Sequence, residues 1–360
     1  MPDVSALPPG VADPTAVHRL DTYTTLGLGG PARRVVALTD TDEVIQSVRA
    51  LAAEGEPTLV LGGGSNVVIA DEGFPGTVVL LRTRGIRVVE ADPGTVTVEV
   101  DAGTVWDEVV ATAVAEGWSG LECLSGVPGS AGATPIQNVG AYGQEVAEVI
   151  TGVRVLDRHT GQVVTLPPDR CGFGYRTSVF KRSDRWVVLS TTFRLRRRAA
   201  SGPLRYPELA AAVGRRTGQV APLAEVRQAV LDLRRRKGMV IDPADPDTRS
   251  VGSFFTNPVL DDAGWRRLRS RTAEPPPSWP AGDGAVKVSA AWLIERAGFP
   301  KGYGNGDGVA ISGKHSLALT HRGGGTTAAL LALAREIRDG VRDRFGVTLH
   351  PEPVLVGCTL

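Results

Sequence analysis

Short blocks of hydrophobic residues, separated by glycine, proline and acidic residues, run through the first half of the chain. Such blocks, rich in valine, leucine and threonine, are typical of β-strands with turns between them. The predicted strands cover residues 33–38, 58–61, 77–81, 86–90, 95–100, 153–156, 163–166 and 186–195, and the pair 153–156 and 163–166 is expected to form a hairpin.

Helices are indicated where apolar residues recur every three or four positions. Asp40 and Glu43 have the spacing of a capping box and predict a helix that ends near Gly55. The other segments predicted from the pattern are helices at 104–117, 224–235, 290–297 and 326–345, strand character at 310–320 and a short final strand at 350–356. Strands and helices in this mixed order favour an α+β fold.

The length and composition of the chain indicate how it is divided into domains. The 360 residues are enough for two or three domains, and the composition changes at 196–203, where a boundary is expected. Residues 1–17, rich in proline, alanine and aspartate, are expected to be a flexible arm and lack the pattern of a signal peptide. No segment approaches the ~18 consecutive apolar residues that would predict a membrane span.

Charge and cysteine content give no indication of nucleic-acid or membrane binding. The formal net charge is +1, and the basic runs 196–198 and 234–237 are expected to be solvated ends of a strand and a helix. Cys123, Cys171 and Cys358 have neither metal-ligand spacing nor a close pair. Reduced thiols in the cytosol and no metal site are therefore expected.

Two glycine-rich segments carry the strongest chemical signal. Residues 124–143 combine glycine with serine, threonine, glutamine and asparagine, and residues 60–69 lead from an apolar strand into three glycines. Successive backbone N–H groups in such loops form concave sites for anions, so the pair indicates a large phosphate-bearing cofactor. The alternative is that both are tight turns between strands.

A third segment, 27–32, fits the dinucleotide fingerprint G-x-G-x-x-G/A. That fingerprint requires a strand before it and a helix after it. Here polar residues precede the motif and Pro31 leads into a strand, so a Rossmann domain is not predicted.

Several segments together resemble a known family. They are 25–31, 61–66, 126–130, 135–143, 175–181, 252–258, 292–295 and 350–353, and they span about residues 19–357. Each is weak alone, but in this order they resemble the flavoprotein UDP-N-acetylenolpyruvoylglucosamine reductase (MurB) family of peptidoglycan synthesis.

This resemblance implies an α+β architecture: a two-part FAD-binding module of the vanillyl-alcohol-oxidase (PCMH-type) superfamily and a C-terminal α+β substrate-binding domain. The implied parts are a flexible arm at 1–17, a first FAD-binding subdomain at 18–83 joined by the C-terminal strand at 346–360, a second at 84–198, and a substrate-binding domain at 199–345.

The resemblance also implies the reaction. NADPH would reduce a non-covalently bound FAD, which would then reduce UDP-N-acetylglucosamine enolpyruvate to UDP-N-acetylmuramate. No segment indicates a site for the 2′-phosphate that distinguishes NADPH from NADH. The implied FAD-binding residues are Gly62, Gly63, Gly64, Ser65, Asn66, Gly126, Ser130, Gln137, Asn138 and Gly140.

Three residues match the family's catalytic positions. Ser253 matches the proton donor, although a serine in this context could also cap a turn. Arg176 matches the residue that binds the enolpyruvyl carboxylate, a task suited to a permanently charged, forked guanidinium; the alternative is a surface ion pair. Glu352 matches a carboxyl group that acts as an acid or as the electrostatic partner of Arg176. Pro353, where an apolar residue is expected, bears on the geometry of Glu352.

The resemblance also implies residues that contact the substrate, and these residues bear on the alternative functions. The matching substrate-binding residues are Tyr206, in the tyrosine loop of the longer subclass, Lys237, Asn257 and Glu295. Another FAD oxidoreductase of the same superfamily would lack part of this set, and a non-catalytic binding module would not need Ser253. We expect a cytoplasmic enzyme with a small-molecule substrate and no nucleic-acid, membrane or obligate protein partner.

Overall fold

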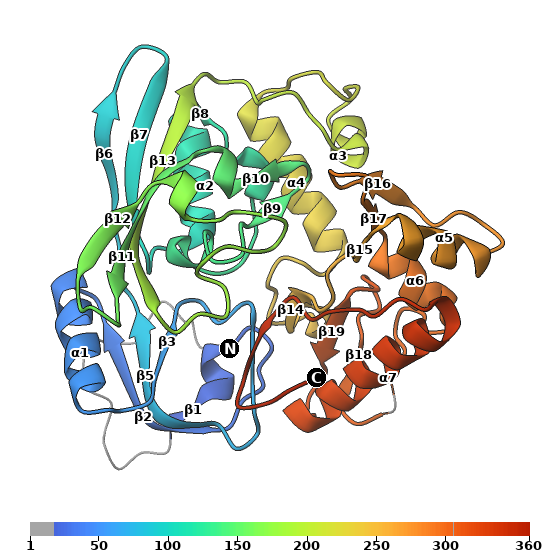
Figure 1. The fold of residues 1–360 in the computed structure, drawn as a ribbon. Helices are drawn as coiled ribbons and strands as arrows, with labels where there is room; N and C mark the ends of the chain where they lie inside the picture. Colours follow the sequence, from blue (N-terminus) through green and yellow to red (C-terminus); the bar gives the residue numbers. More distant parts are fainter. Residues whose placement is uncertain (1–17, 305) are drawn as a thin grey trace. The chain divides into compact units, whose positions relative to one another are not determined.

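The chain forms two compact units, and neither is a single stretch of sequence (Figure 1). The computed structural model describes residues 18–304 and 306–360, so the predicted flexible arm at 1–17 lies outside the described residues. The first unit contains Ala32–Gly64 and Phe74–Val240. The second contains Arg19–Pro31, Ser65–Gly73 and Ile241–Leu360. Residues 199–240 thus cluster with the first unit.

The first unit begins with a small four-stranded sheet, and the last three strands in its order pair in parallel. In sheet order the strands are β1 (His18–Arg19), β2 (Pro31–Leu38), β5 (Phe74–Leu81) and β3 (Thr58–Leu61). Helix α1 (Thr41–Ala53) connects β2 to β3 and begins where predicted, because the Asp40 carboxylate accepts the N–H groups of Asp42 and Glu43 at 2.8 and 3.0 Å.

A larger antiparallel sheet forms the centre of the first unit. Its order is β12 (Val163–Leu166), β11 (Ile150–Asp157), β13 (Trp186–Arg197), β7 (Thr95–Asp101) and β6 (Ile86–Ala91), and β8 (Trp118–Ser119) also pairs with β13. The predicted hairpin is confirmed, since β11 and β12 pair in antiparallel register. Trp106 of α2 (Trp106–Ala115) packs against Phe193 of this sheet, with ring centroids 5.7 Å apart.

Two helices of the first unit cover a separate apolar cluster. Helices α3 (Pro207–Ala212) and α4 (Leu223–Arg236) bury Leu209, Val230 and Leu233. Arg227 of α4 donates two hydrogen bonds to the Asp107 carboxylate of α2, at 2.7 and 2.8 Å. A short hairpin pairs β9 (Gly140–Ala141), at the end of the predicted glycine-rich segment, with β10 (Gln144–Glu145), which directly follows that segment.

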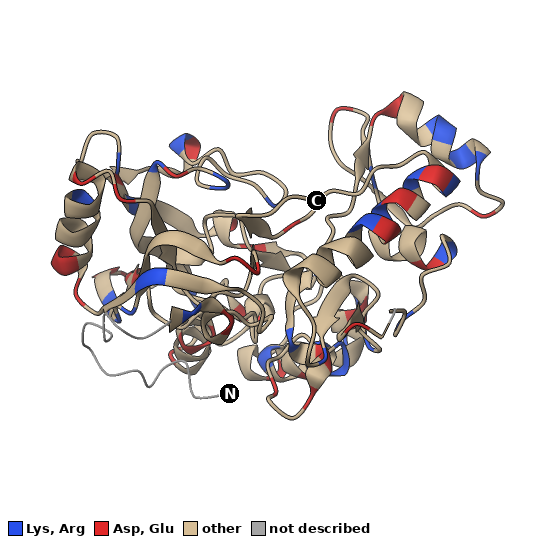
Figure 2. Ribbon diagram, turned by 90° about the horizontal axis from the view of Figure 1, so that it is seen from below, with Lys and Arg blue, Asp and Glu red and all other residues tan. Residues whose placement is uncertain are grey.

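The second unit is built from small antiparallel sheets and three helices. One sheet has the order β14 (Ser250–Ser253), β19 (Ala318–His321), β18 (Val309–Ile311), and the other β15 (Val259–Leu260), β17 (Val286–Val288), β16 (Ser278–Pro280). The helices are α5 (Asp262–Ser270), α6 (Ala290–Arg296) and α7 (Thr327–Phe345). Acidic and basic residues alternate along the C-terminal half of α7 (Figure 2), whereas Leu330, Ile337 and Val341 are buried.

One element prediction in this unit is wrong in detail. The segment 310–320 is not one strand, because β18 and β19 form an antiparallel hairpin in which Ile311 pairs with Leu319. Ser312 stabilises the turn, its hydroxyl accepting the N–H groups of Lys314 and His315 at 3.0 and 3.2 Å.

The final strand returns to an early part of the chain. β20 (Val354–Val356) pairs in parallel with β4 (Val67–Ile69), and both belong to the second unit. Among the described residues, no helix has both the length and the apolar character needed to cross a bilayer. The predicted α+β class is confirmed by this mixture of small sheets and helices.

Candidate active site

The two predicted glycine-rich loops of the first unit lie directly against each other. A Cβ atom at Gly62 would stand 2.4 Å from Ser130 Oγ, and one at Gly63 would stand 2.7 Å from the Cα atom of Gly129. With Ser130 and Gly129 in these positions, a side chain at 62 or 63 would clash with the other loop. In the part of the chain that the structure describes, the N–H groups of Gly63 and Gly64 donate to no protein acceptor. Backbone donors in such a cradle fit the diphosphate of FAD.

Gly126 contributes packing rather than a donor to this site. Its N–H group donates to Asp107 Oδ1 at 2.6 Å, and a Cβ atom there would lie 2.8 Å from Leu231 Cδ2 of α4. The glycine thus lets α4 pack closely against the loop. Gln137 is half-buried further along the same segment.

The Asn138 side chain holds the glycine-rich segment together. Asn138 has a φ of 47°. Its amide group donates to Glu145 Oε2 at 2.7 Å and to the Gly174 carbonyl at 3.1 Å, and its Oδ1 accepts the Ala147 N–H at 3.1 Å. Because the side chain is engaged in these contacts, any contact of Asn138 with a cofactor would come from its backbone.

Arg176 lies in a tight turn that is fixed against the same segment. Gly174 and Thr177 close the turn, and Arg176 has a φ of 53°. A non-glycine residue in this region costs about 1–3 kcal/mol and persists only where its surroundings hold it. Here Arg176 Nη2 donates to the Gly140 carbonyl at 2.6 Å, and Lys181 Nζ donates to the Arg176 carbonyl at 2.9 Å.

In the second unit, Ser253 and Glu352 come from neighbouring segments. Ser253 ends β14, and the next residue, Phe254, accepts the Glu352 N–H at 2.9 Å through its carbonyl oxygen. Phe255 and Pro351 form an antiparallel bridge beside this contact. Two predicted catalytic residues, about 100 positions apart in sequence, are thus brought to one place in the fold.

The alternative role of Ser253, as the cap of a turn, has no support in the described contacts. Its side chain is half-buried, and among the described residues its hydroxyl has no hydrogen-bond partner, so it caps no turn. Gly252 has a φ of 76° and no protein atom within 4 Å of an added Cβ. The backbone conformation at position 252 therefore favours glycine, and close packing of described residues does not.

Pro353 does not disturb the Glu352 backbone. It stands where the chain changes partner, from the Phe254 carbonyl to β4, and Val354 N–H donates to the Asn66 carbonyl at 3.0 Å. A residue without an N–H group is tolerated between two pairings. Asn66 and Ser65, both predicted to bind FAD, immediately precede β4 in the second unit.

Two predicted substrate residues of the first unit meet at Tyr142. The Tyr206 ring packs edge-on against it at a centroid distance of 5.3 Å. Lys237 Nζ lies 5.9 Å from the Tyr142 ring centroid and 2.7 Å from Glu208 Oε2. Burial raises the pKa of Tyr142 to about 12, so its phenol is a neutral donor at ordinary pH.

Arg234 is a residue that the sequence interpretation missed. The run 234–237 was expected to be a solvated helix end, which holds for Arg235 and Arg236 but not for Arg234. Its Nη2 donates to the Met239 carbonyl at 2.7 Å, while its buried Nε has no acceptor among the described residues. Burial lowers the pKa of Arg234 to about 10, which leaves the guanidinium charged at neutral pH.

The other two predicted substrate residues have structural contacts in the second unit. Asn257 Oδ1 accepts the Ala290 N–H at 2.9 Å, at the start of α6. Glu295 is exposed and accepts a hydrogen bond from the Ser316 hydroxyl. Within the described ranges, no cluster of His, Cys, Asp and Glu residues has the arrangement of a metal site.

Comparison with known proteins identifies the family. A model of an FAD binding domain matches residues 32–167, and a model of the UDP-N-acetylenolpyruvoylglucosamine reductase C-terminal domain matches residues 243–356. The chain is 62% identical to the UDP-N-acetylenolpyruvoylglucosamine reductase of Salinispora arenicola (strain CNS-205), over 99% of this chain and 100% of that protein. The chain belongs to the UDP-N-acetylenolpyruvoylglucosamine reductase family.

Other members of the reductase family are similar to this chain over nearly its full length. The protein of that name from Thermobifida fusca (strain YX) is 57% identical, over 95% of this chain and 97% of its own. The crystal structure of the reductase from Thermus caldophilus superposes with a TM-score of 0.64 at 26% identity, covering 95% of this chain and 99% of that one. The predicted family and the predicted FAD-binding domain are thus confirmed.

Proposed function

We propose that this protein is the NADPH-dependent, FAD-containing enzyme that reduces UDP-N-acetylglucosamine enolpyruvate to UDP-N-acetylmuramate in peptidoglycan synthesis. The observation that carries the proposal is full-length identity of 62% to a relative named UDP-N-acetylenolpyruvoylglucosamine reductase. The cradle formed by residues 62–64 and 129–130, and the pairing of the Ser253 and Glu352 segments, support it.

In this proposal the chain holds FAD without a covalent bond. When bound, FAD supplies the hydride chemistry between NADPH and the enolpyruvyl double bond. Gly62, Gly63 and Gly64 contribute backbone to the diphosphate site, and Ser130 closes the cradle behind Gly62. Asn138 and Gly140 shape the segment against which Arg176 is fixed.

The chain's own residues then handle charge and the proton. Ser253 donates a proton to C2 of the enolpyruvyl group; its hydroxyl makes no hydrogen bond to the described part of the chain. Arg176 binds the substrate carboxylate and the negative charge that develops beside it, because a preorganised guanidinium stabilises such charge strongly. Glu352 acts as an acid or as the electrostatic partner of Arg176.

Substrate binding is assigned to Tyr206, Lys237, Asn257 and Glu295, with Tyr206 in the tyrosine loop of the longer subclass. The contacts of Tyr206 and Lys237 with Tyr142 support a shared role for these two. The functional division into 18–83, 84–198, 199–345 and a returning 346–360 is part of the same proposal, as is a cytoplasmic location for an enzyme with a nucleotide-linked substrate.

An anaerobic visible spectrum of the purified protein tests the proposal. Addition of NADPH should bleach the flavin absorbance, and addition of UDP-N-acetylglucosamine enolpyruvate should restore it. Recovery with oxygen alone would indicate an oxidase of the same superfamily instead. A protein that takes up no FAD would overturn the proposal.

Substitution of Ser253 tests the proton-transfer role separately. Ser253→Ala should leave bleaching by NADPH intact and slow the recovery with substrate by about 10²–10⁴-fold, the usual contribution of a positioned general acid. Ser270→Ala is the matched control, because the Ser270 hydroxyl on α5 donates to the Arg267 carbonyl within its own helix. Equal recovery rates in both variants would contradict the role of Ser253.

A further inference from the structure

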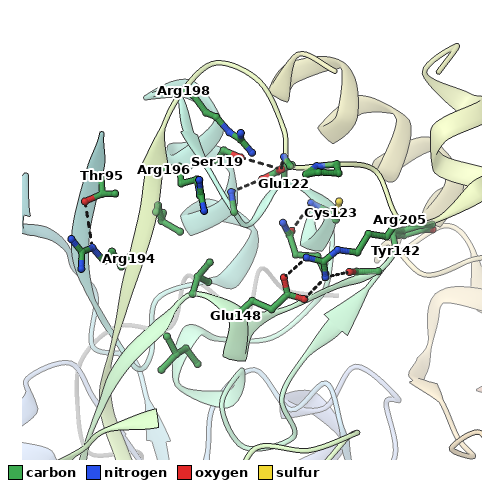
Figure 3. Close-up of a pocket in the computed structure, with 18 of the residues that line it drawn as sticks. Thr95, Ser119, Glu122, Cys123, Tyr142, Glu148, Arg194, Arg196, Arg198 and Arg205 are labelled. Carbon is green, nitrogen blue, oxygen red and sulfur yellow. Dashed lines mark hydrogen bonds and ion pairs between the residues drawn. The ribbon is translucent and has the colours of Figure 1, made fainter. Parts of the chain in front are cut away.

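A cavity in the first unit is lined by none of the catalytic, cofactor-binding or substrate-binding residues proposed above. It has a volume of about 870 Å³ and is lined by parts of β7, β8, β11 and β13 and by the segments 120–123, 142–144 and 202–205. In Figure 3, Arg194 lies at one end of the cavity beside Thr95, and Arg205 lies at the other beside Glu148. A cavity of this size is typical of sites for small organic ligands.

The cavity wall carries a row of arginines. Arg194, Arg196 and Arg198 are alternate residues of β13 and its C-terminal extension, and all three line the cavity. Alternate strand residues point to the same face about 7 Å apart, so long side chains there can converge on one ligand. Arg196 and Arg198 have no carboxylate within 4.0 Å among the described residues. Arg194 does have an acidic neighbour, but the distance from its Nη2 to Asp92 Oδ2 is 3.8 Å, which is long for an ion pair.

The acidic residues of the cavity are already engaged. The Glu148 carboxylate accepts two hydrogen bonds from Arg205, at 2.7 and 3.0 Å. Glu122 is 1% exposed. Its carboxylate oxygens accept the N–H groups of Gly120 and Gly202 at 2.7 and 3.2 Å. Four arginines and two glutamates line the cavity, and one arginine pairs with Glu148, so the wall carries a net positive charge.

We propose that this cavity is a binding site for a small organic diphosphate, separate from the site of the proposed reaction. Guanidinium groups bind phosphate oxygens through paired N–H donors, and two or three of them in a concave site can hold a diphosphate. Like charges close together repel one another, so a bound polyanion lowers the electrostatic cost of bringing these arginines together.

The cavity wall includes residues that are adjacent to Tyr206 or in contact with it. Arg205, which directly precedes Tyr206, lies in the cavity wall and also donates to the Gly143 carbonyl at 3.0 Å. Tyr142, in the same wall, packs against the Tyr206 ring. Occupancy of the cavity should thus alter the mobility of the Tyr206 segment.

Calorimetric titration of the FAD-loaded full-length protein with inorganic pyrophosphate tests the site. Saturating UDP-N-acetylglucosamine enolpyruvate is present throughout, to occupy the proposed active site. We expect binding to persist under these conditions and to weaken at least tenfold in the double variant Arg196→Ala, Arg198→Ala. Arg196→Lys, which keeps the charge but loses the fork, should weaken binding by a smaller factor.

Arg197→Ala is the matched control, because Arg197 lies on the same strand but donates to the Asp92 carbonyl at 3.1 Å and does not line the cavity. Its affinity for pyrophosphate should stay within twofold of the parent. No binding at millimolar pyrophosphate with substrate present, or equal binding by the double variant, would overturn the proposal. Because the readout is binding, these results do not depend on the proposed reaction.

Discussion

Gly62 and Gly63 differ in what an added side chain would meet. A Cβ atom at Gly62 meets the hydroxyl of Ser130, whereas one at Gly63 meets the backbone of Gly129. A side-chain atom can be removed by substitution, but a backbone atom cannot. We therefore predict that Gly62→Ala weakens FAD binding about tenfold or more, that Ser130→Ala restores it, and that Gly63→Ala has no such rescue.

The ratio of flavin to protein absorbance after dialysis measures this prediction. With Ser130 Oγ removed, the nearest remaining contact of the new methyl group is Ser130 Cβ at 3.5 Å, an ordinary van der Waals distance. Ser130→Ala alone serves as the control for any direct contact of its hydroxyl with FAD. If the double variant binds FAD no better than Gly62→Ala, the steric explanation is wrong.

Asp157 makes the stability of the first unit dependent on pH. Two hydrogen bonds from Arg185, at 3.1 and 2.7 Å, are the largest cause that lowers the pKa of this carboxyl group to about 2. Because the unfolded value is about 3.9, the ion pair stabilises the fold fully above about pH 4. That contribution is lost as the pH falls from about 4 towards 2.

Urea unfolding of the parent and of Asp157→Asn over this pH range tests the assignment. We predict that the variant is less stable at neutral pH and that the difference between the two proteins shrinks as the pH falls towards 2. Asp184→Asn is the control, since this exposed residue forms no ion pair among the described residues. A difference that stays constant with pH would exclude Asp157 as the titrating group.

At the scale of elements, the start of α7 depends on a residue far away in sequence. The Asp71 carboxylate accepts the N–H groups of Thr327 and Ala328, both at 2.8 Å. An acidic group here satisfies two of the helix's unpaired donors and opposes its positive end. The glycine-rich segment 321–325, which precedes α7, resembles a phosphate-binding loop. At the start of this helix, however, the N–H groups of Thr327 and Ala328 are already bound by the Asp71 carboxylate.

We predict that Asp71→Ala lowers the free energy of unfolding by about 1–2 kcal/mol, as loss of an N-terminal cap does. Hydrogen exchange should show faster opening of the Thr327 and Ala328 amides. Glu72→Ala, at the exposed neighbouring residue, should change neither quantity. Unchanged exchange at α7 in Asp71→Ala would show that water replaces the cap without cost.

The elements that the sequence predicted well are those with a clear apolar period or a local cap. β3 has the predicted limits, and α1 begins at the predicted Asp40 cap. Helix α5 was not predicted because it buries only Leu268 and so has no apolar stripe. β14 was not predicted because Gly252, at positive φ, interrupts its pattern.

The candidate site shows the same limit. Glycine density and the family resemblance pointed to the FAD loops, but not to the contacts that hold them. Arg176 bonds to Gly140, and Asn138 to Gly174, across 36 residues of sequence in each case. No local pattern encodes a pairing at that separation, and the buried position of Arg234 equally depends on how α4 packs.

At the scale of the whole molecule, the second unit is not a segment that can be cut out. Its apolar core includes Leu26, Leu28 and Val68, which precede the main part of the unit by more than 170 residues. Removing them leaves cavities, and each buried leucine lost costs about 2–5 kcal/mol. The sum is comparable with the 5–15 kcal/mol that stabilises a typical domain.

We therefore predict that a fragment of residues 241–360 does not fold by itself, although it contains the whole match to the family's C-terminal domain, 243–356. It also lacks β4, the partner of β20, so the strand that follows Glu352 would have an unpaired edge. An amide NMR spectrum with narrow dispersion and a non-cooperative urea transition should result. Val68→Ala in the full chain should lower the stability of the same unit without removing any strand. A well-dispersed fragment would show that the core at Leu330, Ile337 and Val341 of α7 is sufficient, and that the early segments only dock onto it.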